Sequence, residues 1–595
     1  MCGIAGYIGK NCAEKQLLES LKLLEYRGYD SAGIAVQDKN KINITKTTGK
    51  IIALENMLTS TKSICGIAHT RWATHGAPTY ENTHPHLSND STWAVVHNGI
   101  IENYGTIKKD LISKGYNFKS ETDTEVIANL LQQQNSNDIH ALINTCNMLI
   151  GSYALACINK NIPNKIFLAR KKSPLYVASE QGEVFIASDP VCFLSKASEY
   201  YTLADNQYCI ASTKHLEFFN TSGQKINLQP TKTEKFDISY QKHNYKHYME
   251  KEINQVPAVL NNLIETYKSA DLLKKFDKNY LAKFNKIVLI GCGTAYHAGL
   301  MGARYIQEFA RIDASCHIAS EYRYCNPIID NKTLCILVSQ SGETADTLAV
   351  CELAKAHGAT TVALTNVLYS TLARMADEIL PVCAGTEIAV ASTKAYTAQI
   401  TVLYMFAKQL QNVIANKKEN YYEIVHKLAK KITIPSPKSL KKAVLEVLAS
   451  EKVFFIGRDY DYVSVKEASL KLKEITYINT AEHPAGELKH GFLSLVDKNS
   501  VVFALATQQH LLNKTLNGAH EALARGAKVI MVSQFNIPKE QTQGFYHTVK
   551  LQKFSEELLP ISCISFFQLL AYETSLAKGL NPDQPRNLAK SVTVE

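Results

Sequence analysis

The sequence predicts a multidomain α/β protein, with a sheet-rich first third followed by two α/β units of similar topology. Three observations lead to this fold class. The chain of 595 residues is too long for one hydrophobic core and is expected to form about three or four domains. Its first third contains short alternating segments, whereas the rest alternates apolar strands with longer amphipathic helices. The second part also repeats itself, which is typical of tandem domains.

In the first third, residues 93–96 and 184–187 have the pattern of strands, and residues 12–26 and 124–134 have the apolar period of helices. From about residue 242 to residue 277 the chain becomes polar, rich in Lys and helical in period. This change of character predicts the end of the first domain.

The repeat is visible in two pairs of segments. Lys286–Gly291 is echoed by Lys452–Gly457, and residues 356–362 are echoed by residues 524–530, with offsets of 166 and 168 positions. The pattern of residues 415–442 predicts the connection between the two domains. The apolar stretch at residues 561–571 follows a Pro and predicts a buried helix too short to span a bilayer.

The composition is typical of a soluble globular protein, with 46% hydrophobic and 20% charged residues. The formal net charge is +10, and the sequence contains no long block of like-charged residues. It therefore gives no indication of a nucleic-acid-binding arm. The 14 cysteines lack C-x-x-C pairs and metal-type spacing, and the N-terminus lacks the pattern of a secretory signal. We therefore expect a cytoplasmic protein with free thiols and no membrane partner.

Cys2 follows the initiator Met1 directly. Removal of Met1 would leave the thiol beside its own α-amino group, whose ordinary pKa of about 7.7–8.0 allows it to accept the thiol proton. Such a pair is a known nucleophile for acyl transfer. The alternative is that Cys2 is one small buried residue among many.

A buried strand runs into the segment Ser339–Thr344, Ser-Gln-Ser-Gly-Glu-Thr, and a helix is expected to begin there. Hydroxyls and backbone N–H groups at a helix N-terminus predict a phosphate site, although a plain Ser/Thr cap is the alternative. Residues 506–509 of the second repeat lack this motif, so we expect one phosphate site per chain. Residues 291–294 begin a dinucleotide-type fingerprint, but Tyr296 replaces its third glycine, so a nicotinamide or flavin site is disfavoured.

Glu467, Lys471 and Glu474 are spaced to share one face of a helix predicted over residues 463–477. A surface ion-pair ladder is the usual explanation, but the apolar neighbours at 470, 472 and 475 indicate a packed helix and favour a functional face. Residues 487–491 add a further acid, a Lys and the titratable His490. Five histidines at positions 69, 75, 84, 86 and 97 match no metal template, and we expect them to make hydrogen bonds.

Together, these motifs resemble those of the glutamine–fructose-6-phosphate aminotransferase family over nearly the whole chain. The motifs are residues 2–4, 26–33, 69–76, 97–99, 339–344, 391–394, 470–474 and 583–595. A different glutamine amidotransferase would need an Asp-Asp or a Ser-Gly-Gly-x-Asp-Ser loop, and neither is found. A non-catalytic phosphosugar sensor would leave Cys2 and Glu474 without a role.

The resemblance implies an N-terminal-nucleophile glutaminase domain with an α/β/β/α sandwich, followed by two sugar isomerase (SIS) domains. We expect the glutamine amidotransferase type 2 domain at residues 2–215, a linker and helical segment at 216–276, the SIS domains at 277–417 and 446–585, and a tail that acts as a lid at 586–595. The chain lacks the long insertion of eukaryotic homologues and is similar to the bacterial type. No metal or organic cofactor is implied.

In the first domain the resemblance implies that Cys2 attacks the glutamine amide and that Asn98 and Gly99 hold the oxyanion. The glutamine-binding residues would be Arg71, Trp72, Thr74, His75 and Asp123, with Arg71 on the α-carboxylate and Asp123 on the α-ammonium. Released ammonia would pass Trp72.

In the SIS domains the resemblance implies that Glu474 moves a proton between C1 and C2 of fructose 6-phosphate and that Lys590 forms a Schiff base with the ketose. His490, supplied by the second subunit of a homodimer, would assist ring opening, and Glu467 and Lys471 would support proton transfer. The sugar-phosphate-binding residues would be Thr294, Ser339, Gln340, Ser341, Thr344, Val390, Ala391 and Ser392.

Three segments depart from the family pattern. Asp459–Val463 lacks the usual Gly and Pro, Phe492 stands where Pro is common, and residues 254–257 differ from the usual Tyr-Glu-Gln-Pro. None removes a catalytic group, so they affect the expected loop geometry and not the expected activity.

Overall fold

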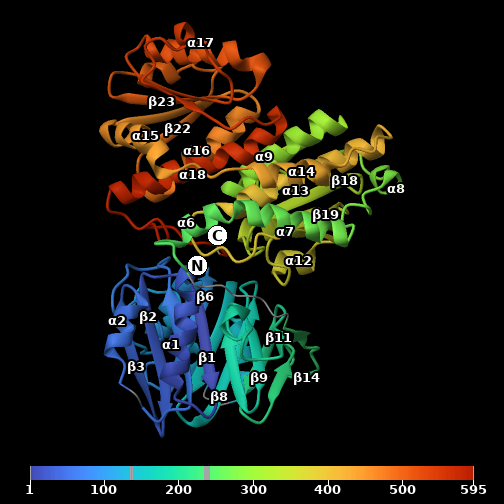
Figure 1. Cartoon of the computed structure of the whole chain (residues 1–595). Helices are drawn as coiled ribbons and strands as arrows, with labels where there is room; N and C mark the ends of the chain where they lie inside the picture. The colour runs from blue at the N-terminus through green and yellow to red at the C-terminus, as the bar shows by residue number, and fades with distance from the viewer. Residues whose placement is uncertain (1, 60, 135, 137, 234–241, 594–595) are drawn as a thin grey trace. The chain divides into compact units, whose positions relative to one another are not determined.

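The computed structural model describes residues 2–59, 61–134, 136, 138–233 and 242–593 (Figure 1). The chain divides into two compact units, one of residues 1–238 with 589–595 and one of residues 239–588. Met1, whose removal the sequence predicts, lies outside the described residues, as do residues 234–241 of the predicted linker and 594–595 of the predicted tail.

The first unit contains two antiparallel sheets that pack face to face. The strands of the first sheet, in spatial order, are β15 (Thr231–Lys232), β11 (Glu199–Thr202), β9 (Tyr176–Glu180), β10 (Glu183–Ala187), β1 (Gly3–Ile8), β4 (Cys65–Arg71), β2 (Ser31–Asp38) and β3 (Lys41–Thr48). Those of the second are β14 (Lys225–Ile226), β13 (Leu216–Phe219), β12 (Gln207–Ala211), β8 (Ile162–Lys171), β7 (Gly151–Asn159), β6 (Trp93–Ile101) and β5 (His86–Leu87). Alternate apolar side chains of both sheets, including Ile4, Ile67 and Val96, fill the core between them.

Helices cover the outer faces of both sheets. The first sheet carries α1 (Ala13–Leu24) and α2 (Ile51–Met57), and the second carries α3 (Tyr104–Ser113), α4 (Glu125–Gln133) and α5 (Ile139–Asn147). The predicted α/β/β/α sandwich is therefore confirmed. The helices and strands predicted for the first third, such as α1, α4, β6 and β10, all form.

The second unit contains two parallel sheets with the same strand order. The first runs β17 (Ala314–Ile318), β16 (Lys286–Gly291), β18 (Thr333–Ser339), β19 (Thr360–Thr365) and β20 (Glu378–Pro381). The second runs β22 (Thr480–Pro484), β21 (Lys452–Gly457), β23 (Ser500–Ala506), β24 (Lys528–Ser533) and β25 (His547–Lys550). This order, 2-1-3-4-5 along the chain, confirms the predicted tandem repeat and places a ligand-binding switch point after the first and third strands of each sheet.

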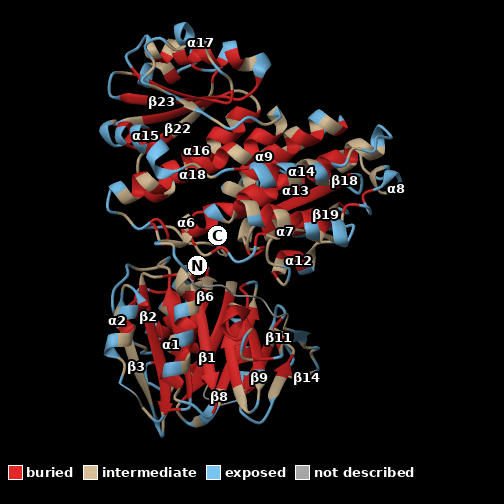
Figure 2. Ribbon diagram, in the orientation of Figure 1, coloured by how far each residue is buried: buried red, intermediate tan, exposed pale blue. Residues whose placement is uncertain are grey.

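The helices of the second unit connect these strands and join the two sheets through one core. They are α6 (Tyr248–Asn254), α7 (Val256–Ser269), α8 (Lys278–Leu281), α9 (Thr294–Tyr305), α10 (Ala319–Tyr322), α11 (Ala345–Ala356), α12 (Thr371–Met375), α13 (Lys394–Ile414), α14 (Tyr421–Lys431), α15 (Pro437–Ala449), α16 (Tyr460–Thr476), α17 (Leu512–Leu523) and α18 (Leu559–Ala577). The predicted buried helix is α18, which is buried along most of its length (Figure 2). No helix of the described segments is both long and apolar enough to cross a membrane.

The segments that depart from the family pattern are accommodated by packing. Phe492 is buried and stacks edge-on against Phe454 at 4.8 Å between ring centroids. Asp459 has φ of +52°, a conformation that favours glycine, and its carboxylate is held by the Arg304 guanidinium at 2.6 Å. Pro257 lies in the first turn of α7, where its missing N–H costs no hydrogen bond.

Candidate functional site

Cys2 lies immediately before β1, and the pairing of β1 with β4 sets its surroundings. Because Gly3 pairs with Thr70, the end of β4 brings Arg71 and Trp72 to the thiol. The Trp72 N–H donates to Cys2 Sγ at 3.2 Å. Burial raises the pKa of the Cys2 thiol, although the Trp72 N–H and the Arg71 charge oppose this. A thiol in this environment needs a base to become a nucleophile.

Two side chains hold the carbonyl oxygen of Cys2. Asn98 Nδ2 donates to it at 3.0 Å and Arg27 Nε at 3.3 Å. Arg27 is also paired with Asp189 at 3.0 Å. In the sequence Arg27 is distinguished only by its place in the motif at residues 26–33, which does not predict that it fixes the backbone of the nucleophile.

Asn98 and Gly99 occupy β6, and each is fixed by its neighbours. His69 Nε2 lies 3.1 Å from Asn98 Oδ1 and 2.9 Å from the His97 carbonyl oxygen. Both partners are acceptors, so Nε2 carries the proton and sets the orientation of the amide. Burial lowers the pKa of His69 to about 3, which keeps the ring neutral. Gly99 has φ of +138°, and a Cβ there would lie 2.0 Å from the Ser152 carbonyl oxygen, so glycine is required.

Arg71 and Asp123 are both buried beside the nucleophile. The Arg71 guanidinium donates to the carbonyls of His75, Gly76 and Ala77 and so shapes the loop after β4. Burial lowers the pKa of Arg71, against the opposing effect of nearby acidic groups. The Asp123 carboxylate accepts the Ile101 N–H at 2.8 Å.

A small cavity joins the residues predicted for the glutamine site. The residues that line it are Cys2, Arg71, Trp72, Thr74, His75, His84, His97, Gly99, Thr122, Asp123 and Thr124. Seven of the eight predicted glutaminase residues thus line one cavity, and the eighth, Asn98, contacts the Cys2 backbone directly. Their convergence from β1, β4, β6 and the segment before α4 provides a nucleophile with charged groups of both signs.

The buried histidines make hydrogen bonds, as the sequence predicts. His84 Nε2 and His97 Nδ1 lie 2.8 and 2.9 Å from Thr124 Oγ1, and His86 Nε2 lies 3.1 Å from Thr122 Oγ1. Burial lowers the pKa of all three rings. In the part of the chain that the structure describes, no group of His, Cys, Asp and Glu is arranged to hold a metal ion.

The predicted phosphate loop lies at the switch point of the first SIS sheet, between the end of β18 and the start of α11. Ser339 Oγ accepts the Gly342 N–H at 3.1 Å and lies 3.1 Å from Thr344 Oγ1. Thr344 stands at the N-cap of α11, but its side chain makes no capping hydrogen bond. Hydroxyls gathered at a helix N-terminus without capping it are more consistent with an anion site than with a plain cap.

The corresponding place in the second SIS sheet is filled by the protein itself. The Thr507 N–H donates to the Asp461 carboxylate at 2.8 Å, and the Thr507 hydroxyl donates to it at 2.5 Å. Burial raises the pKa of Asp461 to about 7. An internal carboxylate therefore takes the Thr507 donors at this place, and one phosphate site per chain stays a prediction.

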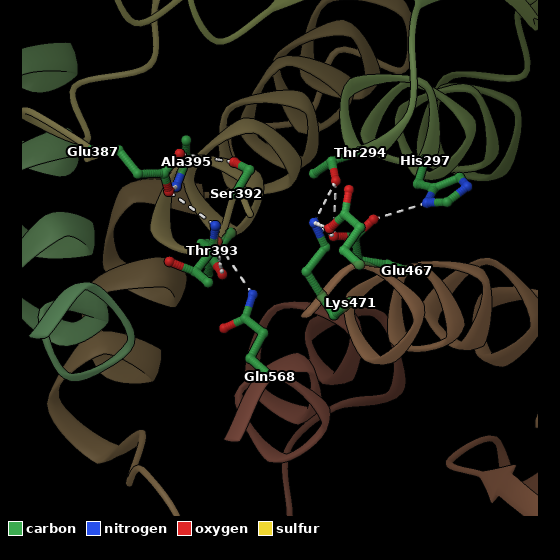
Figure 3. A network of polar contacts seen from close by, with 11 residues as sticks. Thr294, His297, Glu387, Ser392, Thr393, Ala395, Glu467, Lys471 and Gln568 are labelled. Atoms are coloured by element: carbon green, nitrogen blue, oxygen red, sulfur yellow. Dashed lines mark hydrogen bonds and ion pairs between the residues drawn. The ribbon is translucent and has the colours of Figure 1, made fainter. Parts of the chain in front are cut away.

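Glu467, Lys471 and Glu474 share one face of α16, as predicted. Figure 3 shows the side chains of Glu467 and Lys471 beside each other. Lys471 Nζ lies 2.5 Å from Glu474 Oε2 and 3.4 Å from Glu467 Oε1, and it donates to Thr294 Oγ1 at 3.0 Å. Burial lowers the pKa of Lys471, but the two carboxylates outweigh burial and raise it above its ordinary value. His297 of α9 also contacts Glu467, and no motif in the sequence pointed to it.

The segment Val390–Ser392 is held from two directions. The Val390 N–H donates to the Asp583 carbonyl at 3.0 Å, and the Ser392 hydroxyl donates to Glu387 Oε2 at 2.9 Å (Figure 3). Glu387 also accepts the N–H groups of Thr393 and Ala395 at the start of α13. Glu387 and Asp583 thus fix the backbone of the predicted sugar loop, a role that the sequence did not reveal.

The remaining predicted residues are not gathered in the same way. His490 is exposed in the turn after β22, and its N–H donates to the Glu487 carbonyl at 3.0 Å. Gln340 is half-buried and its carbonyl accepts the Asn366 N–H at 3.2 Å. Lys590 is half-buried in the segment that belongs to the first unit, whereas Glu474 belongs to the second.

Comparison with known proteins identifies the two kinds of domain. A glutamine amidotransferase domain model matches residues 69–195, and a SIS domain model matches residues 280–409 and 447–544. The chain is 44% identical to a glutamine–fructose-6-phosphate aminotransferase (isomerizing) of Caldanaerobacter subterraneus over 612 residues, covering 100% of both chains. The corresponding protein of Clostridium acetobutylicum is 42% identical over 618 residues, again covering 100% of both.

The chain belongs to the glutamine–fructose-6-phosphate aminotransferase (isomerizing) family. The resemblance inferred from the motifs is therefore confirmed. A solved C-terminal domain of a glucosamine-fructose-6-phosphate aminotransferase from Francisella tularensis is 32% identical, with a TM-score of 0.52, and covers 58% of this chain and 100% of that chain. This agrees with two tandem SIS domains in the second unit.

Proposed function

We propose that this protein converts D-fructose 6-phosphate and L-glutamine to D-glucosamine 6-phosphate and L-glutamate. Such a reaction is the first step of hexosamine and UDP-N-acetylglucosamine biosynthesis. The observation that supports this most strongly is that one chain carries both a Cys2 pocket lined by opposite charges and, on a SIS helix, a Glu467–Lys471–Glu474 triad whose first two members are buried. Neither site alone accounts for both the glutaminase reaction and the isomerase reaction.

In the glutaminase reaction, Cys2 attacks the amide carbon of glutamine after its thiol proton passes to the α-amino group exposed by removal of Met1. Asn98 Nδ2 and the Gly99 N–H stabilise the oxyanion, which is worth about 3–4 kcal/mol per donor in such sites. Arg71 pairs with the substrate α-carboxylate and Asp123 with its α-ammonium. Thr74 and His75 complete the pocket wall.

In the isomerase reaction, the hydroxyls of Ser339, Ser341 and Thr344 and the side chain of Gln340 bind the phosphoryl group at the N-terminus of α11. Thr294 and the segment Val390–Ser392 bind the sugar. Lys590 condenses with the C2 carbonyl of the open-chain ketose and releases water. Ammonia then adds to C2 of this imine and displaces the Lys590 amine, which leaves a ketimine of ammonia at C2. The ketimine acidifies the C1 hydrogen, and Glu474 takes this proton and returns it to C2 while the C1 hydroxyl loses its proton and becomes the aldehyde of the 2-amino sugar.

Lys471 and Glu467 support this step through charge. The Lys471 ammonium lies against Glu474, the group that accepts the proton, and supplies a positive charge beside it. Ammonia from the Cys2 site reaches the sugar past Trp72 without release to water. The exposed His490 assists ring opening in the site of a second copy of the chain, so the active assembly is a homodimer in the cytoplasm.

The test is to incubate the purified protein with glutamine and fructose 6-phosphate and to assay glutamate and glucosamine 6-phosphate in the same reaction. We expect both products in a ratio near one to one. Glutamate without glucosamine 6-phosphate at any fructose 6-phosphate concentration would contradict the proposed coupling of the two sites.

A further inference from the structure

Glu467 is a fully buried carboxylate whose two oxygens have different partners. Its side chain is 0% exposed. Oε1 accepts the Thr294 hydroxyl at 3.1 Å and lies 3.4 Å from Lys471 Nζ, whereas Oε2 lies 2.8 Å from His297 Nδ1. A buried carboxylate is stable only when it is paired and hydrogen-bonded. The contact with His297 therefore holds Oε2, the Glu467 oxygen that is not paired with Lys471.

His297 and Thr294 lie three residues apart on α9 and therefore share one face of that helix. Figure 3 shows both side chains directed at Glu467 on α16, so the contact joins the first SIS domain to the second. The imidazole is nearly buried, with its side chain 10% exposed. Because Nδ1 faces an acceptor, Nδ1 carries a hydrogen and donates a hydrogen bond to the carboxylate.

The chain of contacts continues from Glu467 to the proton-transfer residue. Lys471 Nζ is placed by Glu467 Oε1, Thr294 Oγ1 and Glu474 Oε2 together. If Glu467 rotated about its side chain, Lys471 would lose one of these anchors and could turn away from Glu474. The geometry of Glu474 toward the sugar therefore depends on what holds Glu467 in place.

We propose that His297 is a positioning residue that locks the Glu467 carboxylate and, through Lys471, sets the place and charge environment of Glu474. This rests on the proposed function, in which Glu474 moves the proton between C1 and C2. His297 does not reach the phosphate loop Ser339–Thr344 in this account, so it affects proton transfer and not sugar-phosphate binding.

Two substitutions separate this role from a purely structural one. His297→Leu retains most of the side-chain volume but removes the donor, whereas His297→Asn places an amide N–H near the position of Nδ1. With glutamine saturating, we expect His297→Leu to lower kcat by about tenfold to a hundredfold, the effect of losing a hydrogen bond to a charged group. The KM for fructose 6-phosphate should stay near the wild-type value, and His297→Asn should recover most of kcat.

A matched control is His357→Leu, because His357 is exposed at the end of α11 in the same domain, and it should leave kcat unchanged. Exchange of the C1 hydrogen of fructose 6-phosphate with deuterated water gives a direct readout of proton abstraction and should slow in His297→Leu by the same factor as kcat. Glutamate release from glutamine alone should be unaltered in all three variants.

Wild-type kcat and C1 exchange in His297→Leu would overturn the inference. Equal losses in His297→Leu and His297→Asn would also overturn it, since the donor would then be irrelevant. If the wild-type protein itself made no glucosamine 6-phosphate, the proposed function would fail first, and the wild-type measurement distinguishes these cases.

Discussion

Replacing Lys471 by Met tests the charge balance on which the isomerase proposal depends. The substitution nearly preserves the length of the side chain but removes an ammonium that lies 2.5 Å from Glu474 and 3.4 Å from Glu467. Loss of one partner of a buried ion pair costs about 3–5 kcal/mol. Glu467 is 0% exposed and Glu474 is 21% exposed. Because water can still reach Glu474, we expect the lower end of this range, about 3 kcal/mol.

The expected change in kcat follows from the positive charge that Lys471→Met removes. The pKa of Lys471 is raised by the two carboxylates, so Lys471 stays cationic throughout a normal assay range and its positive charge lies beside Glu474. In Lys471→Met the ammonium between the two carboxylates is absent, so a proton bound to one of the carboxylates must partly replace its positive charge. We therefore expect kcat to fall and the acidic limb of the pH–rate profile to move to higher pH by about one to three units.

The assay is the pH dependence of glucosamine 6-phosphate formation, together with denaturant unfolding of the second unit followed by a probe in that unit. Lys473→Met is the matched control, because Lys473 lies two residues away on α16 and is exposed. It should change stability by less than about 0.5 kcal/mol. An acidic limb in Lys471→Met that coincides with those of Lys473→Met and the wild type would refute the reasoning.

Four further predictions concern the remaining site residues. Cys2→Ala should abolish glutamine hydrolysis while fructose 6-phosphate still binds; glutamate production at more than a trace would rule out the nucleophile. Gly99→Ala should disrupt glutaminase activity because its Cβ would lie 2.0 Å from the Ser152 carbonyl oxygen, and normal glutamate release would show that β6 can shift to make room. Lys590→Ala should lose glucosamine 6-phosphate synthesis, and borohydride with fructose 6-phosphate should label the C-terminal peptide of the wild type; labelling of Lys471 instead would identify a different lysine. Trp72→Ala should release glutamate but less glucosamine 6-phosphate, and a ratio that remains near one to one would exclude Trp72 from the ammonia path.

Local pattern in the sequence determined much of the architecture. The repeat offset placed β16 and β21 at their observed bounds, because parallel α/β units repeat hydrophobic strands and turns at fixed places along the chain. The spacing of Glu467, Lys471 and Glu474 identified one helix face, because helical geometry brings residues four and three apart together. The apolar run in α18 likewise predicted burial without any knowledge of its neighbours.

Tertiary structure alone decided the contacts that join distant segments. His297 meets Glu467 across 170 positions, Arg27 meets the Cys2 carbonyl across 25, and Asp461 takes the donors of Thr507 across 46. A sequence carries no local signal for such pairs, because their partners are chosen by strand order and helix packing. Periodicity tells which face of an element is buried, but only the folded arrangement of the elements determines which polar side chains that face will meet.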